Sequence, residues 1–288
     1  MASRLSIRVP APTTCIAASL RRAELCAQPF PNWRLRGVLP EDVVRALAGL
    51  DVPPARSTGR SGRRELHNET RRYLAGAMLA DHPVAAQIAD AFQSARVAAV
   101  LMALTGAVLV GTYLRIEYAV DLDGFWLEPH TDLGVKALTF FLQLGVPGQE
   151  GLGTDLYVAP DRWAERIPFG WNTALVFVPS DRSWHGFEPR PIVGARRSLI
   201  VNYVTDAWRA REQLAFPDRP IGRSADREYL GDHRGVGDHV RGDGVVADGV
   251  HPGVAGAKRH IGLEHAGAEV GQDDEDQREG GVAGRAED

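Results

Sequence analysis

The chain has 288 residues, an apolar content of 44% and a formal net charge of −4, enough for one large globular domain or two small ones. The charge is uneven, because residues 221–288 carry −7 and residues 1–220 carry +3. A body this close to neutrality lacks the basic surface of nucleic-acid-binding proteins, so we expect no nucleic-acid partner.

The first 28 residues contain several arginines and serines but no apolar core of a secretory signal. We expect residues 1–28 to be a disordered extension, with a transit peptide as the open alternative. Cys15 and Cys26 lie in this segment, and two cysteines form neither a disulfide framework nor a zinc-site spacing. We therefore expect Cys15 and Cys26 to be free thiols and the protein to be cytoplasmic.

The predicted folded domain begins near Pro29. The run PFPNWRLRGVLPEDVVRALAGL predicts a short strand and then a helix that LPED opens, and residues 84–105 have the apolar spacing of one long helix. Residues 97–114 contain no charge and approach the length of a membrane span. However, Gly106 is typical of a helix C-cap, and β-branched and aromatic residues follow it. We therefore predict a buried helix end followed by core strands, and no membrane association.

From residue 111 the pattern changes to seven or eight short apolar runs, separated by Gly, Pro, Asp and Asn. This predicts a mainly β fold (α+β), a β-sandwich or jelly roll supported by N-terminal helices. We expect one domain over residues 29–220, with its barrel core at about 111–206. Residues 221–288 hold 15 of the 31 glycines and one aromatic residue, so they predict a disordered tail.

The sequence EPHTD contains His130 and Asp132, two residues apart. On a strand these side chains share one face, which places an imidazole beside a carboxylate. Such a pair is two-thirds of the 2-His-1-carboxylate triad that binds non-haem Fe(II). The predicted domain holds two other uncommitted histidines, His67 and His82, and a better candidate in His185, which lies between two predicted strands. We predict His185 as the third ligand.

Arg196 follows His185 by eleven residues, in the run ARRSLIVNYV. Strand alternation places Arg196 and Ser198 on one face and Arg197 on the other. A guanidinium that faces into a barrel can bind a carboxylate in bidentate geometry.

This order of motifs, HxD, a distant His, then RxS, resembles that of the Fe(II)/2-oxoglutarate-dependent oxygenase superfamily, and is most similar to prolyl-hydroxylase-like bacterial members. The resemblance covers about residues 111–206 and implies a double-stranded β-helix. It implies Fe(II) ligation by His130, Asp132 and His185, with 2-oxoglutarate and O2 as co-substrates. It assigns Arg196 and Ser198 to the far carboxylate of 2-oxoglutarate, or Arg197 if the register shifts by one residue. Further co-substrate contacts are expected from Tyr113 and Tyr118.

The implied activity is hydroxylation of a small metabolite, amino acid or peptide, with release of succinate and CO2. Halogenases of this superfamily have a small residue where Asp132 stands, so the carboxylate favours hydroxylation. Candidate substrate contacts are Trp126, Arg64 and His67. The run GRSGRRELHNETRR at 59–72 either binds a carboxylate or phosphate of the substrate or is a solvated basic loop, and its arginines are Arg60, Arg63, Arg64, Arg71 and Arg72. Three alternatives stay open: a hydroxylase of protein prolyl or other side chains, a cupin-like metal protein without catalysis, and a 2-oxoglutarate sensor. The sequence does not indicate an oligomeric state.

Overall fold

The computed structural model describes residues 11–52, 62, 71–132 and 134–222, all within a unit that spans Met1–Arg234. A second unit, Gly235–Asp288, lies wholly outside the described residues, and so does nearly all of the predicted disordered tail. Ile221 is an exception, since it is 2% exposed and its amide donates to the Thr112 carbonyl. The folded chain therefore continues past the predicted boundary at residue 220.

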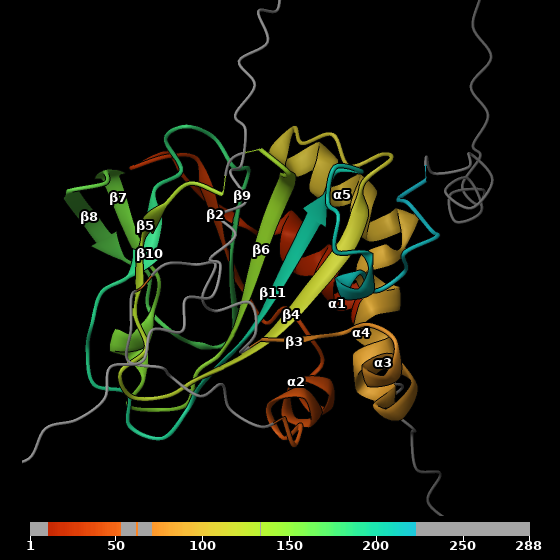
Figure 1. The fold of residues 1–288 in the computed structure, drawn as a ribbon, viewed down its shortest axis with the longest axis horizontal. Helices are drawn as coiled ribbons and strands as arrows, with labels where there is room; N and C mark the ends of the chain where they lie inside the picture. Colours follow the sequence, from red (N-terminus) through yellow and green to blue (C-terminus); the bar gives the residue numbers. More distant parts are fainter. Residues whose placement is uncertain (1–10, 53–61, 63–70, 133, 223–288) are drawn as a thin grey trace, which may run out of the picture. The chain divides into compact units, whose positions relative to one another are not determined.

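Two antiparallel sheets form the body of this unit (Figure 1). The larger sheet has the order β1 (Glu24–Cys26), β2 (Asn32–Arg36), β9 (Trp171–Phe177), β6 (Lys136–Leu144), β11 (Arg196–Val204), β4 (Tyr113–Asp121) and β3 (Arg72–Tyr73). The smaller sheet has the order β5 (Leu127–His130), β10 (His185–Phe187), β7 (Asp155–Ala159) and β8 (Arg162–Arg166). This is the predicted double-stranded β-helix, with the eight strands β4–β11 in the predicted span.

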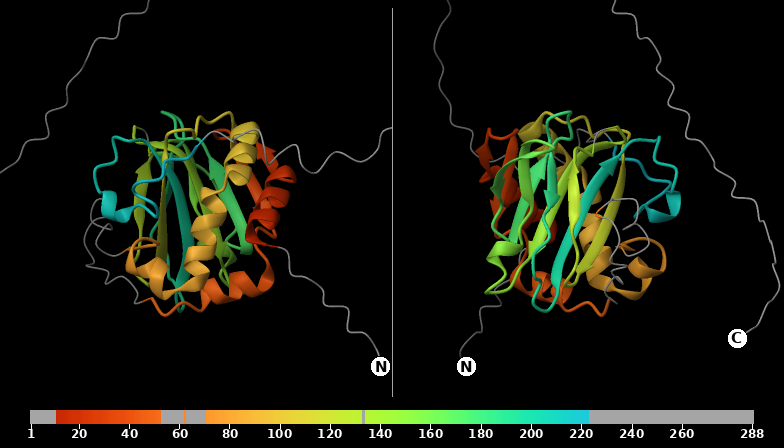
Figure 2. Two further views of the ribbon diagram at one scale, coloured as in Figure 1. Left: turned by 90° about the vertical axis from the view of Figure 1, so that its right-hand side faces the viewer. Right: turned by 60° about the vertical axis from the view of Figure 1, so that its left-hand side comes forward.

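Helices cover the outer face of the larger sheet (Figure 2). The main apolar core lies between this face and α1 (Pro12–Arg21), α2 (Glu41–Ala48), α4 (Pro83–Gln93) and α5 (Ala95–Thr105). In β4 the even-numbered residues from Leu114 to Val120 belong to this core, whereas Glu117 lines a cavity inside the barrel. Period-2 alternation thus separates an apolar outer face from a partly polar inner face.

Two expectations for the N-terminal half were wrong. Residues 12–26 are not a disordered extension, because α1 buries Ile16 and Leu20 in the helix-side core and β1 pairs with β2. The expected long helix is two helices, α4 and α5, which bend by 54° at Ser94. Ser94 has extended backbone angles, and its hydroxyl accepts from the Val97 amide, so it begins a new helix. A short helix, α3 (Ala77–Asp81), precedes them.

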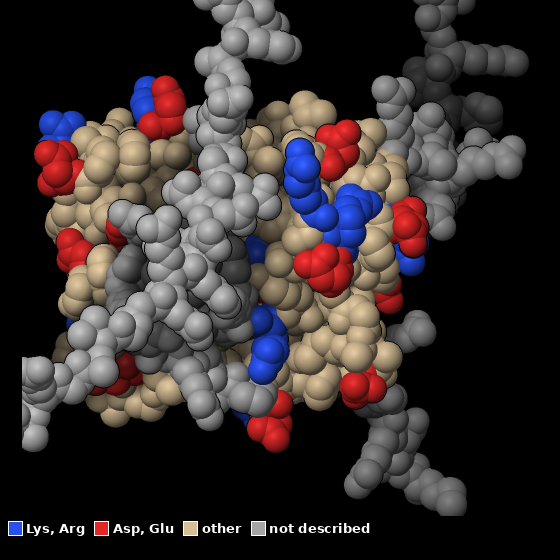
Figure 3. All heavy atoms as spheres, viewed as in Figure 1, with Lys and Arg blue, Asp and Glu red and all other residues tan. Residues whose placement is uncertain are grey.

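Gly106 ends α5 in the left-handed conformation, as predicted. In the described part of the chain no single helix is long and apolar enough to cross a membrane. The bent pair α4 and α5 meets the requirements of length and apolar composition only when the two helices are taken together. On the face seen in Figure 3, acidic and basic side chains of the described residues are interspersed.

Gly153 joins the 3-10 helix η2 (Glu150–Leu152) to β7. Of its two neighbours, Leu152 accepts a hydrogen bond from Arg196 through its carbonyl, and Thr154 lines the cavity. A Cβ at Gly153 would lie 1.4 Å from the Ile167 carbonyl oxygen, whereas one at Gly151 would meet nothing within 4 Å. We expect Gly153→Ala to lower the free energy of unfolding by at least about 1–3 kcal/mol, because backbone must move to admit the methyl group. Urea unfolding measures this, with Gly151→Ala as the matched control. Equal stability of the two variants would contradict the close approach of the Ile167 carbonyl to Gly153.

Candidate metal centre

Strand pairing brings the two predicted histidine ligands together. His130 ends β5 and His185 begins β10, and the two residues are register partners in the smaller sheet. Their rings lie 4.3 Å apart between centroids. The long sequence separation between them is therefore closed by a single antiparallel pair.

Asp132 joins this pair by a different route from the one predicted. It lies beyond the end of β5 and has a φ of 62°, in the left-handed region that Asp adopts more readily than most residues. Asp132 therefore does not share a strand face with His130, as the spacing of two residues predicted. The turn still carries the carboxylate to 3.5 Å from His130 Nε2 and 3.6 Å from His185 Nε2.

Backbone carbonyls fix the tautomer of both histidines. His130 Nδ1 lies 2.9 Å from the Glu128 carbonyl oxygen, and His185 Nδ1 lies 2.8 Å from that of Ser183. A carbonyl oxygen only accepts, so each Nδ1 carries the proton and each Nε2 presents a lone pair on the side of Asp132. This is the hydrogen-bond arrangement that metal-ligating histidines use.

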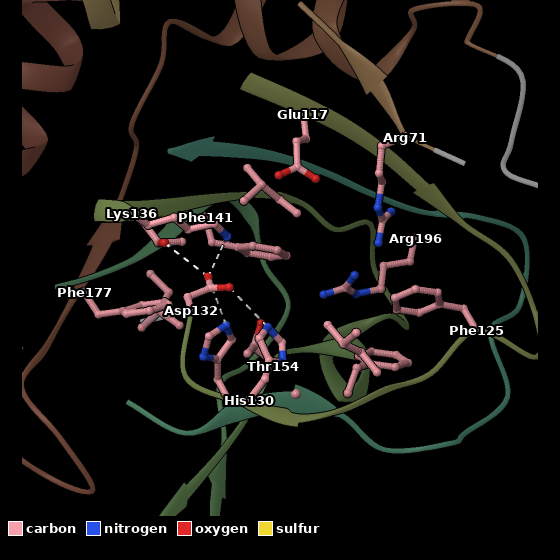
Figure 4. Close-up of a pocket in the computed structure, with 17 residues that line it drawn as sticks. Arg71, Glu117, Phe125, His130, Asp132, Lys136, Phe141, Thr154, Phe177 and Arg196 are labelled. Atoms are coloured by element: carbon pink, nitrogen blue, oxygen red, sulfur yellow. Dashed lines mark hydrogen bonds and ion pairs between the residues drawn. The ribbon is translucent and has the colours of Figure 1, made fainter. Parts of the chain in front are cut away.

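A lysine that the sequence analysis overlooked also reaches this cluster. Lys136 Nζ donates to Asp132 Oδ2 at 2.7 Å, with its side chain only 3% exposed. Thr139 Oγ1 lies 3.5 Å from the same oxygen. Thr139 donates instead to Asn202 at 3.1 Å. Lys136 is therefore the donor that orients one oxygen of Asp132, while the other oxygen lies nearer His130 (Figure 4).

His130, Asp132 and His185 line one cavity inside the barrel together with Arg196. Figure 4 shows His130, Asp132 and Arg196 around it. Its apolar wall consists of Phe125, Leu127, Phe141, Leu175, Phe177, Phe187 and Ile200. Arg196 is buried, and its Nε donates to the Leu152 carbonyl at 2.7 Å. Burial lowers the Arg196 pKa and the Asp121 carboxylate opposes that effect, so the guanidinium stays charged.

The register of β11 separates Arg196 from Arg197. Arg196 shares the inner face with Ile200, whereas Leu199 and Val201 belong to the helix-side core. Arg197 therefore lies on the outer face, where its charge opposes the pKa rise of Tyr118. Ser198, on the inner face, is fully buried, and its hydroxyl has no hydrogen-bond partner in the described part of the protein.

The structure does not bring every candidate to the cavity. Tyr118 points the other way, because its hydroxyl donates to the Leu47 carbonyl of α2 at 2.7 Å, and burial raises its pKa to about 12. Tyr113 packs its ring under Arg211 and does not line the cavity. The Trp126 ring lies against Gly62, and its neighbour Phe125 lines the cavity instead. Arg64 and His67 lie outside the described residues.

Arg71 and three residues that sequence reasoning did not assign to the site lie at its end or wall. Arg71 and Glu117 line the cavity, and Asp121 and Arg115 lie directly behind them as their ion-pair partners. Three of the four alternate along β4, in RIEYAVD. Charged residues at every second or fourth position of an otherwise apolar strand were the available signal for a polar inner face.

No family model and no curated protein matches the chain. Among solved structures it is similar to a prolyl-4-hydroxylase from Pseudomonas putida, with 16% identity, a TM-score of 0.41, and 71% of this chain and 100% of that chain covered. A prolyl 4-hydroxylase from Phytophthora capsici has 13% identity, a TM-score of 0.48, and coverage of 70% and 68%.

The α-ketoglutarate-dependent epimerase SnoN from nogalamycin biosynthesis has 18% identity, a TM-score of 0.40, and coverage of 67% and 83%. All three are distant likenesses with TM-scores below 0.5, and no property of these proteins is carried over to this chain. The chemistry of this protein must therefore be inferred from the residues of its site.

Proposed function

We propose that this protein is an Fe(II)- and 2-oxoglutarate-dependent oxygenase that hydroxylates a small metabolite, an amino acid or a peptide. One observation carries the proposal. His130, Asp132 and His185 present two imidazole nitrogens and a carboxylate within 4.8 Å of one another, in the cavity that Arg196 also lines.

The donor set fits iron. Two neutral imidazoles and one carboxylate make the facial triad of non-haem Fe(II) oxygenases, which leaves open positions on the metal. Both imidazoles have the required tautomer, and Asp132 is held by Lys136 rather than left to rotate. These outer hydrogen bonds orient metal ligands and tune them.

The opposite end of the cavity fits a dicarboxylate. Arg196 presents a charged, buried guanidinium there. Ser198 lies on the same face of β11, and its hydroxyl is buried without a protein partner among the described residues. Buried polar groups are nearly always hydrogen-bonded, so this hydroxyl has capacity for a further partner. Ser198 is not among the residues that line the cavity, however, so the dicarboxylate site rests on Arg196.

The protein residues have separate tasks in this proposal. Bound iron would supply the activation of O2, with 2-oxoglutarate as the source of two electrons. Arg196 would fix the far carboxylate and so orient the keto acid toward the histidines. Phe141, Phe177 and Phe187 line the cavity and reduce its water content, which strengthens each charged contact.

The test is succinate formation by the purified protein under air with Fe(II), 2-oxoglutarate and a pool of metabolites and short peptides. We expect succinate only when Fe(II) and 2-oxoglutarate are both present, with more of it and one oxidised product when the pool contains the substrate. A cupin-like protein would bind the metal but form no succinate. A sensor would bind 2-oxoglutarate without consuming it, and either result would overturn the proposal.

A further inference from the structure

Arg196 is not alone at its end of the cavity. Asp121 accepts from Arg196 Nη1 through Oδ2 at 2.5 Å and from Arg71 Nη1 through Oδ1 at 2.5 Å. All three side chains are buried, with exposures of 5%, 7% and 1% for Arg196, Arg71 and Asp121. Both guanidiniums line the cavity, and Figure 4 shows them entering from different elements toward the same region.

The charges in this group do not balance. Among the described residues, two guanidiniums share one carboxylate, which leaves one positive charge at this end. The other charged side chains that line the cavity in the described part of the chain have partners of opposite sign, Lys136 with Asp132 and Glu117 with Arg115. Burial lowers the pKa of Arg71, but attraction to Asp121 and Glu117 outweighs it and raises that pKa, so Arg71 stays charged. An uncompensated buried charge is expensive, so this end favours one bound anionic group.

Aromatic rings hold the two guanidiniums and keep water from them. The Phe125 ring centroid lies 5.2 Å from the Arg71 guanidinium carbon, and the Phe187 and Phe169 centroids lie 4.6 and 4.9 Å from that of Arg196. Arg196 already uses Nε to bind Leu152 and one Nη to bind Asp121. Its capacity for a ligand carboxylate is therefore partial, and Arg71 supplies further donors beside it.

We propose that Arg71 is a second anchor for the far carboxylate of the bound 2-oxo acid, and that Asp121 is the positioning residue that holds both arginines. This inference rests on the proposed function and adds a residue from outside the barrel core to its co-substrate site. One excess charge matches one ligand carboxylate. The pair therefore makes the site selective for a dicarboxylate, rather than leaving Arg71 to a carboxylate of the substrate.

The experiment compares two ligands that differ in the far carboxylate, 2-oxoglutarate and 2-oxopentanoate. Their dissociation constants are measured by calorimetry with Mn(II)-loaded protein, in the wild type, Arg71→Gln and Arg72→Gln. Arg72 is the neighbouring arginine, but its side chain is exposed, so it is a matched control. We expect Arg71→Gln to weaken 2-oxoglutarate at least about tenfold, with 2-oxopentanoate changed less than about twofold and Arg72→Gln unchanged for both.

Three outcomes would overturn the inference. Unchanged 2-oxoglutarate binding in Arg71→Gln removes Arg71 from the co-substrate site, and a higher KM for the hydroxylated substrate alone would move it to the substrate. Equal weakening of both ligands would show that Arg71 acts through the fold.

If Arg71→Gln does not fold, Arg71→Lys takes its place and should weaken only 2-oxoglutarate, because lysine keeps the charge but not the planar fork. Equal binding of 2-oxoglutarate by Arg71→Lys and the wild type would then contradict the anchor. Failure of the proposed function is visible separately in the wild type, which would then either show no metal-dependent binding of 2-oxoglutarate or bind it without forming succinate.

Discussion

His185→Ala should abolish 2-oxoglutarate turnover and lower the affinity for Fe(II) or Mn(II) by more than about 100-fold. Loss of a hydrogen bond that merely orients a metal ligand costs about 10–100-fold in metal affinity, and removing the ligand itself costs more. His185 is buried, paired in register with His130 and held by the Ser183 carbonyl, so the fold fixes its position in the cluster. Calorimetry with Mn(II) measures the affinity without turnover.

His82→Ala is the matched control for this experiment. His82 is the one other histidine in the described ranges, and it lies at the start of α4, away from the residues that line the cavity. We expect it to bind metal as the wild type does. If His185→Ala instead bound metal as tightly as the wild type, His185 would not be a ligand, and His67 would become the next candidate.

The strands could be predicted from the sequence because, in most of them, one face is buried and apolar and the other face has a different composition. The runs at 113–121, 136–144, 171–177 and 196–204 are apolar, β-branched and bounded by turn residues, and all four are strands of the larger sheet. The same alternation places Arg196 inside and Arg197 outside. Local pattern was sufficient there because burial of one face sets the register.

The N-terminal helices were harder to predict, because their limits depend on single residues and on tertiary contacts. Ser94 lies inside a continuous apolar helical pattern, and only its extended backbone angles divide α4 from α5. Residues 12–21 are mostly small residues with one arginine, yet α1 is stabilised by packing on α5 and α4. Helices gain most of their stability from such packing, which a local pattern does not show.

The site divides in the same way. The residue types and spacing singled out His130, Asp132, His185 and Arg196, and the structure brings all four to one cavity. The contacts around the site were not readable, because Lys136 meets Asp132 only through the turn between β5 and β6, and Asp121 meets Arg71 from 50 residues away in the sequence. Tyr118 was wrongly predicted as a co-substrate contact. An aromatic residue can lie on either face of its strand, and the sequence before the HxD motif does not indicate which face until the strand register is known.

Arg196→Ala should raise the dissociation constant for 2-oxoglutarate by roughly thirty-fold or more, whereas Arg197→Ala should leave it within about twofold. Truncating one partner of a desolvated charge pair costs about 2–5 kcal/mol, and every 1.4 kcal/mol is tenfold. The two residues are adjacent and of one type, but they lie on opposite faces of β11, so they form a matched pair. Binding to the Mn(II)-loaded protein measures the constant directly.

The metal site supplies the internal control for this prediction. Neither arginine is among the three proposed ligands, so Mn(II) affinity should survive in both variants.

With Arg71 also at the anchor, the Arg71→Gln, Arg196→Ala double variant should lose less binding free energy for 2-oxoglutarate than the sum of the two single losses, because both residues bind the same carboxylate and are held by Asp121. Strict additivity would place them at separate ligand groups. A reversed ranking of Arg196 and Arg197 would place the wrong face of β11 inside the barrel, and no change in either variant would favour the cupin-like alternative.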